Sequence, residues 1–381
     1  MRPLTMMDKT GGTMSVKVMM VVLPAVLLLP FAVYLYVFLK RMGRLIPSAF
    51  VQKHVRLFSI LGSILLVLPA VNIWNMWIVV VLYLVLTSIA VDIVHWLIGK
   101  IAKGRFRRQK LYQCGVLPIL CTALILGYGW WNMQHVVQTD YTVYTDKDIR
   151  DEGYRVVLIT DLHFGTIMDE TALQKHCADI AALQPDLVVL GGDIVDEHTT
   201  LAEMQTVFPT ISSIPSTYGT FYIYGNHDRA RYATAKPYTE AQLTAAIQDA
   251  GIQILRDACT RINDDLTIVG RMDRSAERRP SSALLEGVSE EDFLLLLDHQ
   301  PCELEENRQA GYDLLLSGHT HGGQIWPLGV LAELFGVHPV TYGYRQVGDL
   351  QVIVSSGIAG WGYPLRTERH SEYVCMDIRK R

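Results

Sequence analysis

The sequence predicts a membrane region of four transmembrane helices followed by a soluble domain of the α/β class. Four long apolar runs lie within the first 135 of the 381 residues. The first 139 residues carry 14 Lys/Arg and 2 Asp/Glu, whereas the remainder carries 20 Lys/Arg and 36 Asp/Glu. Such a charge asymmetry indicates two separate units. We assign residues 1–135 to the membrane region, 136–153 to a linker and 154–381 to the soluble domain.

The four apolar runs extend over about residues 16–39, 55–71, 74–98 and 111–131. A run of about 18 or more apolar residues is long enough to cross the hydrocarbon core of a bilayer. The first run has a second interpretation as a signal peptide. That interpretation is disfavoured because the run is too long, no small-residue cleavage site follows it, and basic residues come directly after it.

The basic residues of this region predict its orientation. They cluster in the loops after the first and third runs, and the hairpin between the second and third runs has none. The positive-inside rule places such basic loops in the cytoplasm. With four spans, both termini and the soluble domain would then be extracytoplasmic, in a multi-pass protein of the cell membrane. Arg2, Lys9 and Lys17 oppose this orientation.

Asp92 and His95 lie near the cytoplasmic end of the third run. An ionisable residue within a span marks a functional site by default. Both residues lie within two turns of the interface, however, which favours a solvated helix end. Within the spans we find no pattern of polar residues typical of a transporter.

The soluble region begins at about Tyr141, where short β-branched runs alternate with helical patterns. "YRVVLITD", "PDLVVLGGD" and "GTFYIYGNHD" are typical of buried strands, and "TEAQLTAAIQDAG" has helical spacing. Strands that alternate with helices predict an α/β layered domain. In such domains ligands bind beyond the carboxyl ends of the strands.

Acidic, amide and imidazole side chains follow five of the predicted strands, each at the strand end. Any one of these elements alone is usually structural, but five of them together predict a site. Carboxylate and imidazole ligands suit Mn, Fe or Zn, and the lack of cysteine argues against a structural zinc site. A lone aspartate can bridge two ions. The residues are Asp161 and His163, Asp193, Asn226 with His227 and Asp228, His299, and His319 with His321.

Several of these residues lie within the motifs "GGD", "GNHD" and "GHTHGGQ", and "SSGIAGWGYPLR" follows nearer the end of the chain. Together these residues and motifs resemble the calcineurin-like metallophosphoesterase superfamily. The similarity is greatest to its membrane-tethered bacterial branch and covers about residues 154–379. It implies an αββα fold, a double-layered β-sandwich flanked by helices. It also implies two divalent ions, with Mn favoured over Fe or Zn.

The resemblance implies a role for each matching residue. The first ion would be held by Asp161, His163 and His321. The second would be held by Asn226, His299 and His319, with Asp193 bridging the two. His227 would approach the phosphate as a catalytic residue and protonate the leaving oxygen, and Asp228 would orient its imidazole. The nucleophile would be a metal-bound hydroxide.

The segment Gly270–Ser275 departs from the family pattern. It reads "GRMDRS" where members of the branch often have "GRDD" or "GVDD". Met272 replaces one acid, so Asp273 remains only as a candidate supporting residue. Four arginines in and after this segment form a local basic cluster. It is interpreted either as a solvated loop or as a clamp for a second phosphate or a lipid head group. Its members are Arg271, Arg274, Arg278 and Arg279.

The sequence therefore predicts a membrane-anchored phosphoesterase that hydrolyses a phosphate ester or pyrophosphate. The acidic domain disfavours duplex nucleic acid, and the membrane anchor favours a lipid-linked or cell-envelope substrate. One alternative is a vestigial domain that acts as a membrane sensor or binding module, which the complete ligand set opposes. Another is a channel or transporter, which would require polar or broken spans. The six cysteines could pair outside the cytoplasm, but their spacing does not predict which pairs would form.

Overall fold

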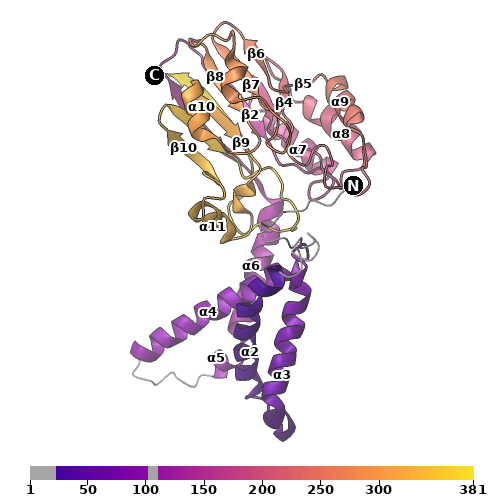
Figure 1. Cartoon of the computed structure of the whole chain (residues 1–381), viewed down its shortest axis with the longest axis vertical. Helices are drawn as coiled ribbons and strands as arrows, with labels where there is room; N and C mark the ends of the chain where they lie inside the picture. Colours follow the sequence, from indigo (N-terminus) through magenta and orange to yellow (C-terminus); the bar gives the residue numbers. More distant parts are fainter. Residues whose placement is uncertain (1–22, 102–109) are drawn as a thin grey trace, which may run out of the picture. The chain divides into compact units, whose positions relative to one another are not determined.

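The computed structural model describes residues 23–101 and 110–381. The chain forms two compact units, Met1–Tyr128 and Gly129–Arg381 (Figure 1). Within the described residues, the first unit is helical and the second contains all the strands.

The described part of the first unit contains α2, α3, α4 and α5, the 3-10 helix η1 and most of α6. Three segments are long and apolar enough to cross a membrane: Ala49–Val71, Trp77–Ile101 and Val116–Gln134. They correspond to the second, third and fourth predicted spans. The first predicted span, 16–39, lies partly outside the described residues, so the described chain contains three candidate spans and not four. The bounds are α2 Leu29–Gly43, α3 Ala49–Val67, η1 Leu68–Val71, α4 Trp77–Ile101, α5 Lys110–Gln113 and α6 Val116–Gln134.

Asp92 belongs to a polar network that joins three helices of this unit. Its carboxylate accepts hydrogen bonds from Arg41 Nη1 on α2 and from Tyr34 OH, both at 2.6 Å. Arg41 also donates to Tyr112 OH on α5 at 2.6 Å, and the ring of His95 stacks on Tyr112 at 3.6 Å. The solvated helix end predicted for Asp92 and His95 is incomplete, because both residues remain partly exposed but their side chains also link helices.

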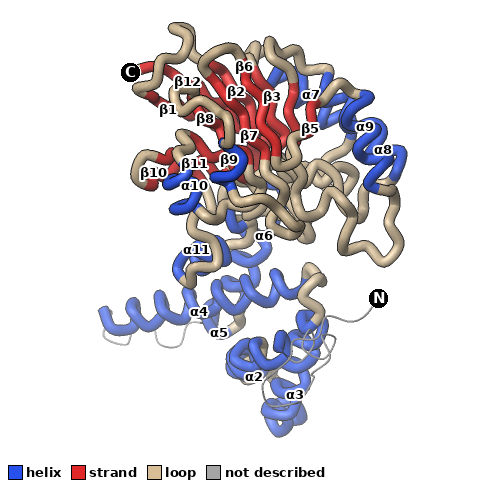
Figure 2. Tube along the Cα trace, turned by 45° about the horizontal axis from the view of Figure 1, so that its top comes forward, coloured by secondary structure: helices blue, strands red, loops and turns tan. Residues whose placement is uncertain are grey.

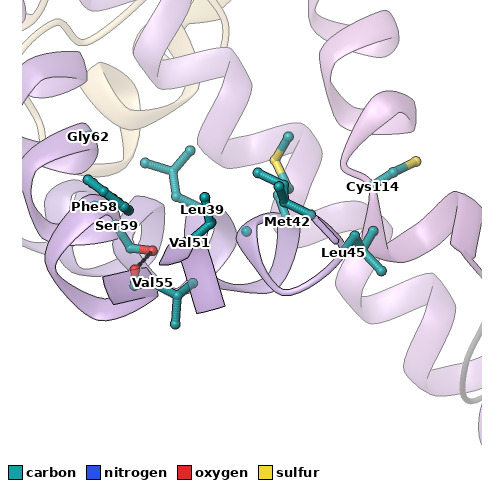
Figure 3. A pocket seen from close by; sticks show the side chains of 11 residues that line it. Leu39, Met42, Leu45, Val51, Val55, Phe58, Ser59, Gly62 and Cys114 are labelled. Atoms are coloured by element: carbon teal, nitrogen blue, oxygen red, sulfur yellow. Dashed lines mark hydrogen bonds between the residues drawn. The ribbon is translucent and has the colours of Figure 1, made fainter. Parts of the chain in front are cut away.

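An apolar cavity of about 480 Å³ lies in the same unit (Figure 3). Leu39 and Met42 of α2 line it together with Val55 and Phe58 of α3. Its lining contains no acid, histidine or basic residue. Apart from the Cys114 thiol, the described lining therefore offers no group for acid–base or metal chemistry.

Two six-stranded mixed sheets form the second unit (Figure 2). The order of the first is β1-β12-β2-β3-β4-β5, and the order of the second is β10-β11-β9-β8-β7-β6. The first sheet comprises β1 Val136–Thr145, β12 Ser371–Lys380, β2 Tyr154–Ile159, β3 Leu187–Leu190, β4 Thr220–Tyr222 and β5 Gln253–Ile254. The second comprises β10 Gly343–Val347, β11 Leu350–Val354, β9 Leu314–Ser317, β8 Phe293–Leu297, β7 Leu266–Gly270 and β6 Ala258–Ile262.

The sheets pack face to face through an apolar core that includes Val156, Leu158, Leu295 and Leu316. The outer face of the first sheet is covered by α7 Glu170–Ala181, α8 Leu201–Ser212 and α9 Glu240–Asp249. The outer face of the second sheet packs against η2 Ser281–Leu285 and α10 Leu304–Ala310. Strands β2, β3 and β4 run parallel, as do β7, β8 and β9. Their carboxyl ends therefore open at one edge of each sheet, as the predicted αββα arrangement requires.

The predicted linker is wrong for residues 136–145, which form the edge strand β1. This strand pairs in parallel with β12, from Val136 beside Ser371 to Thr145 beside Lys380. The strand alternates exposed and inward-facing residues, as an edge strand with one covered face does. The last turns of α6 also belong to this unit, where Asn132 and Met133 are buried.

Candidate metal centre

The strand ends bring six of the seven predicted ligands into two groups. Asp161, which follows β2, lies with His163 and His321. Asp193, which follows β3, lies with His299 and His319. Within each group the ligand atoms lie within 4.8 Å of one another, a span that a single ion can fill. The residues that follow β2, β3, β8 and β9 thus converge as the sequence predicts.

Asp193 reaches both groups. Its Oδ2 lies 3.1 Å from His299 Nε2 in its own group and 3.9 Å from His163 Nε2 in the other. In the first group, Asp161 Oδ1 lies 3.6 Å from His321 Nε2. A carboxylate placed between two sets of ligands matches the geometry of two-metal sites, whose ions lie about 3.5–4 Å apart.

The backbone at the ligands is folded unusually. Asp161, Asp193 and His319 have φ values of 55°, 54° and 71°, in the left-handed region that non-glycine residues rarely adopt. Two glycines make room for the carboxylates. A Cβ on Gly225 would lie 2.1 Å from Asp193 Oδ1, and one on Gly318 would lie 2.2 Å from Asp161 Oδ2.

The donor atoms suit cations. His163 Nε2 and Asn226 Oδ1 are buried and have no hydrogen-bond partner among the described residues, an arrangement that is costly unless an ion occupies the site. His163 Nδ1 lies 3.1 Å from Asp196 Oδ2, and His299 Nδ1 lies 2.8 Å from the Gly191 carbonyl oxygen. Such contacts direct the Nε2 atoms toward a metal. Asn226 stands outside the two groups, and its role as a ligand stays a prediction.

Burial holds the remaining imidazoles neutral. Loss of solvation lowers the pKa of His319 and the pKa of His321 to about 3. Neutral imidazole is the form that binds metal ions, so these side chains need lose no proton at neutral pH. The residues present therefore fit two divalent ions.

His227 borders the centre and is held by a residue that the sequence did not reveal. Its Nδ1 lies 2.9 Å from Glu197 Oε2, and its backbone N–H donates to Asp193 Oδ1 at 2.8 Å. Its ring lies 4.8 Å from the ring of Trp361 and 5.0 Å from that of Tyr232. Glu197 could have been suspected only from its place in "GGDIVDEH", four residues after Asp193.

The predicted contact between Asp228 and the His227 imidazole is wrong. The Asp228 carboxylate instead accepts hydrogen bonds from the backbone N–H groups of Asp193 at 2.7 Å, Gly225 at 2.6 Å and Ile194 at 2.9 Å. Because Asp228 is fully buried, these bonds satisfy its charge and fix the turn that carries Asp193. Its contribution to the site is therefore the shape of that turn.

Neither interpretation of the basic loop is correct for Arg271 and Arg278. Both guanidinium groups are buried and pair with Asp298 and Glu303. The two arginines neutralise Asp298, which immediately precedes His299, so they support a ligand and clamp no phosphate. Asp273 accepts a hydrogen bond from Gln300 Nε2 at 2.9 Å, and these pairs flank His299 on both sides.

The closing segment contributes a further buried contact. Arg366 is fully buried, and it donates from Nη1 to the His321 carbonyl oxygen at 2.7 Å and from Nη2 to the Ala359 carbonyl oxygen at 2.8 Å. Asn132, near the end of α6, donates from Nδ2 to the Arg366 carbonyl oxygen at 3.0 Å. This chain of contacts connects the end of α6 to the segment that carries His321.

Residues 154–323 match the family described as calcineurin-like phosphoesterase. This segment belongs to that family. An uncharacterized metallophosphoesterase of Helicobacter pylori strain J99 is 29% identical over 265 residues, which cover 67% of this chain and 68% of that protein. A transmembrane protein with metallophosphoesterase domain from Danio rerio is 29% identical over 298 residues, covering 74% of this chain and 64% of that protein.

Two further similarities add to these. The Escherichia coli phosphodiesterase YaeI is 28% identical over 236 residues, covering 59% of this chain and 82% of that protein. Among solved structures, a dimetal phosphatase from Danio rerio is similar over 54% of this chain and 87% of that chain, with 12% identity and a TM-score of 0.35. The family predicted from the sequence is confirmed by the match. The chain carries a metallophosphoesterase domain with two His/Asp metal-binding groups and N-terminal apolar helices.

Proposed function

We propose that the protein is a membrane-anchored phosphoesterase that uses two divalent ions, Mn²⁺ in preference to Fe or Zn. The position of Asp193 carries the proposal, because its carboxylate lies within 4 Å of imidazole nitrogens in both ligand groups. Asp161, His163 and His321 would hold one ion. Asn226, His299 and His319 would hold the other.

The reaction would be hydrolysis of a phosphate ester or pyrophosphate. Ions in such a site supply Lewis-acid polarisation of the phosphoryl oxygens and lower the pKa of water. His227 would donate a proton to the leaving oxygen from Nε2, since its Nδ1 faces Glu197. Asp228 would fix the backbone turn at Asp193, and Asp196 would hold the ring of His163.

A lipid-linked or cell-envelope substrate is the class we favour. The last turns of α6, a candidate membrane span, are built into the phosphoesterase unit, which restricts the centre to the neighbourhood of a bilayer. The acidic soluble region disfavours duplex nucleic acid. We further propose that this unit is extracytoplasmic, because the basic loops of the membrane region favour the cytoplasm.

The proposal is tested with the full chain in detergent. We expect turnover of bis-p-nitrophenyl phosphate or p-nitrophenyl phosphate with added Mn²⁺, loss of turnover with a chelator, and recovery when Mn²⁺ is restored. The preferred ester separates diesterase from monoesterase chemistry. Turnover that is indifferent to the chelator would contradict the metal-dependent reaction. A chain that binds two ions but hydrolyses neither these esters nor a pyrophosphate would favour the sensor or binding module.

A further inference from the structure

The segment after the His319–His321 turn exposes an unusual amount of apolar surface. Among residues 136–381, every exposed large aliphatic side chain and every exposed phenylalanine lies between Leu328 and Val337. This stretch comprises α11, Leu328–Leu334, and the three residues that follow it. Leu334 is 72% exposed and Phe335 is 74% exposed. We call Leu328, Val330, Leu331, Leu334, Phe335 and Val337 the α11 patch.

Charge is nearly absent from this part of the chain. Between Gln324 and Val340 the ionisable residues are Glu333 and His338. The Glu333 side chain is 39% exposed, but both carboxylate oxygens have a partner: Oε1 accepts a hydrogen bond from the Thr341 backbone N–H at 2.8 Å, and Oε2 lies 3.9 Å from Arg345. An apolar surface of this kind, whose single acid is paired with neighbouring groups of the protein, marks an interaction site.

The start of α11 is linked to the end of α6 through one short segment of the chain. Arg366 donates its backbone N–H to the Gly129 carbonyl oxygen at 2.8 Å. The next residue, Thr367, accepts a hydrogen bond from the Trp326 backbone N–H at 3.0 Å, and Glu368 accepts one from the Gly329 backbone N–H at 3.2 Å. One short segment, 366–368, therefore contacts both the last turns of a candidate membrane span and the start of α11.

The end of α6 has the character of a membrane interface. Trp130 and Trp131 are 59% and 50% exposed, and tryptophan is enriched where membrane helices leave the bilayer. A helix that ends at the interface places the residues packed against its last turns at the same level. The apolar, uncharged α11 patch then faces the layer in which interfacial helices bury their apolar side.

We propose that the α11 patch rests in the surface layer of the membrane that holds α6. The ligand turn and α11 are adjacent, because a Cβ on Gly323 would lie 2.5 Å from the Gly329 Cα, and the ring of His338 lies 5.8 Å from that of His319. The metal centre would therefore open next to lipid head groups. This last consequence rests on the proposed function, whereas the membrane contact itself does not.

Photo-crosslinking of the full chain tests the contact. Benzoylphenylalanine replaces Leu334 or Phe335, and the protein is reconstituted in vesicles of phosphatidylethanolamine and phosphatidylglycerol with a radiolabelled acyl chain. The control places the same residue at Tyr144 on β1, which is 49% exposed and lies roughly 26 Å along the strand from Val136. Thermal unfolding checks that the three proteins fold like the parent.

We expect irradiation to transfer the label to the chain from positions 334 and 335, at least about tenfold above position 144. Equal labelling at all three positions, or crosslinks at 334 and 335 to a second copy of the chain instead of lipid, would overturn the proposal. The readout requires no turnover. An inactive protein that is labelled at the α11 patch would therefore refute only the proposed function.

Discussion

Replacement of Asp193 by asparagine is expected to lower the turnover of bis-p-nitrophenyl phosphate about a thousandfold or more. This is the upper end of the loss seen when one group that stabilises charge in the transition state is removed. The carboxylate lies between the two ligand groups, so its neutralisation weakens both ion sites together. Asparagine retains the acceptor for the His227 backbone N–H at 2.8 Å, so the turn should persist. Steady-state kinetics and metal content, measured on the same preparation, check the prediction.

Asp273→Asn provides the matched control. Asp273 is also a buried acid near His299, but its carboxylate accepts from Gln300 and from the Ser275 backbone N–H, and an amide oxygen can replace it there. We expect this variant to keep both ions and to lose less than about tenfold in turnover, below the usual loss on removing a residue that orients a ligand. Equal losses in the Asp193 and Asp273 variants would mean that any buried acid at this edge matters, and that Asp193 does not bridge.

Replacement of His227 by alanine is expected to lower kcat by about 10²- to 10⁴-fold, the usual contribution of a positioned general acid, while both ions remain bound. The imidazole lies beside the centre with Nδ1 directed at Glu197, which leaves Nε2 for the leaving oxygen. Its loss removes no metal ligand. The measurement is kcat with a poor leaving group, such as an alkyl phosphodiester, compared with a p-nitrophenyl ester.

The leaving group decides between proton donation and packing. Because p-nitrophenolate needs little protonation, the His227→Ala defect should shrink for the nitrophenyl ester. Glu197→Gln should reduce kcat by about 10- to 100-fold with little change in KM, as expected when a residue that orients an imidazole is lost. Loss of ions from His227→Ala, or the same defect with both leaving groups, would contradict the role proposed for His227.

The ligand residues were predictable because each follows an apolar strand, and parallel strands deliver their carboxyl ends to one edge of a sheet. The groups that support them were not. Glu197 and Asp196 lie in a loop whose path depends on packing, and nothing in local sequence indicates which imidazole each will face. Asp228 was misassigned for the same reason: adjacency in sequence suggested His227, whereas burial directed the carboxylate to four backbone N–H groups.

Long-range pairing explains the other corrections. Arg271 and Arg278 looked like a basic loop because their partners, Asp298 and Glu303, lie 20 or more residues away in the chain. Strand β1 looked like a linker because its polar residues interrupt the apolar pattern, as the open face of an edge strand does. Apolar side chains usually lie inside a folded protein, so the sequence of α11 alone predicts burial. Its exposure depends on which other elements pack against it, and only the structure shows this.

The most direct test of the two-ion centre is the metal content of the full chain. The purified protein is loaded with Mn²⁺, freed of excess ion and measured by mass spectrometry, beside His163→Ala and His319→Ala. Two ions per chain in the parent and about one in each variant are the expected result. A parent chain that hydrolyses phosphate esters with one ion or none bound would contradict the account.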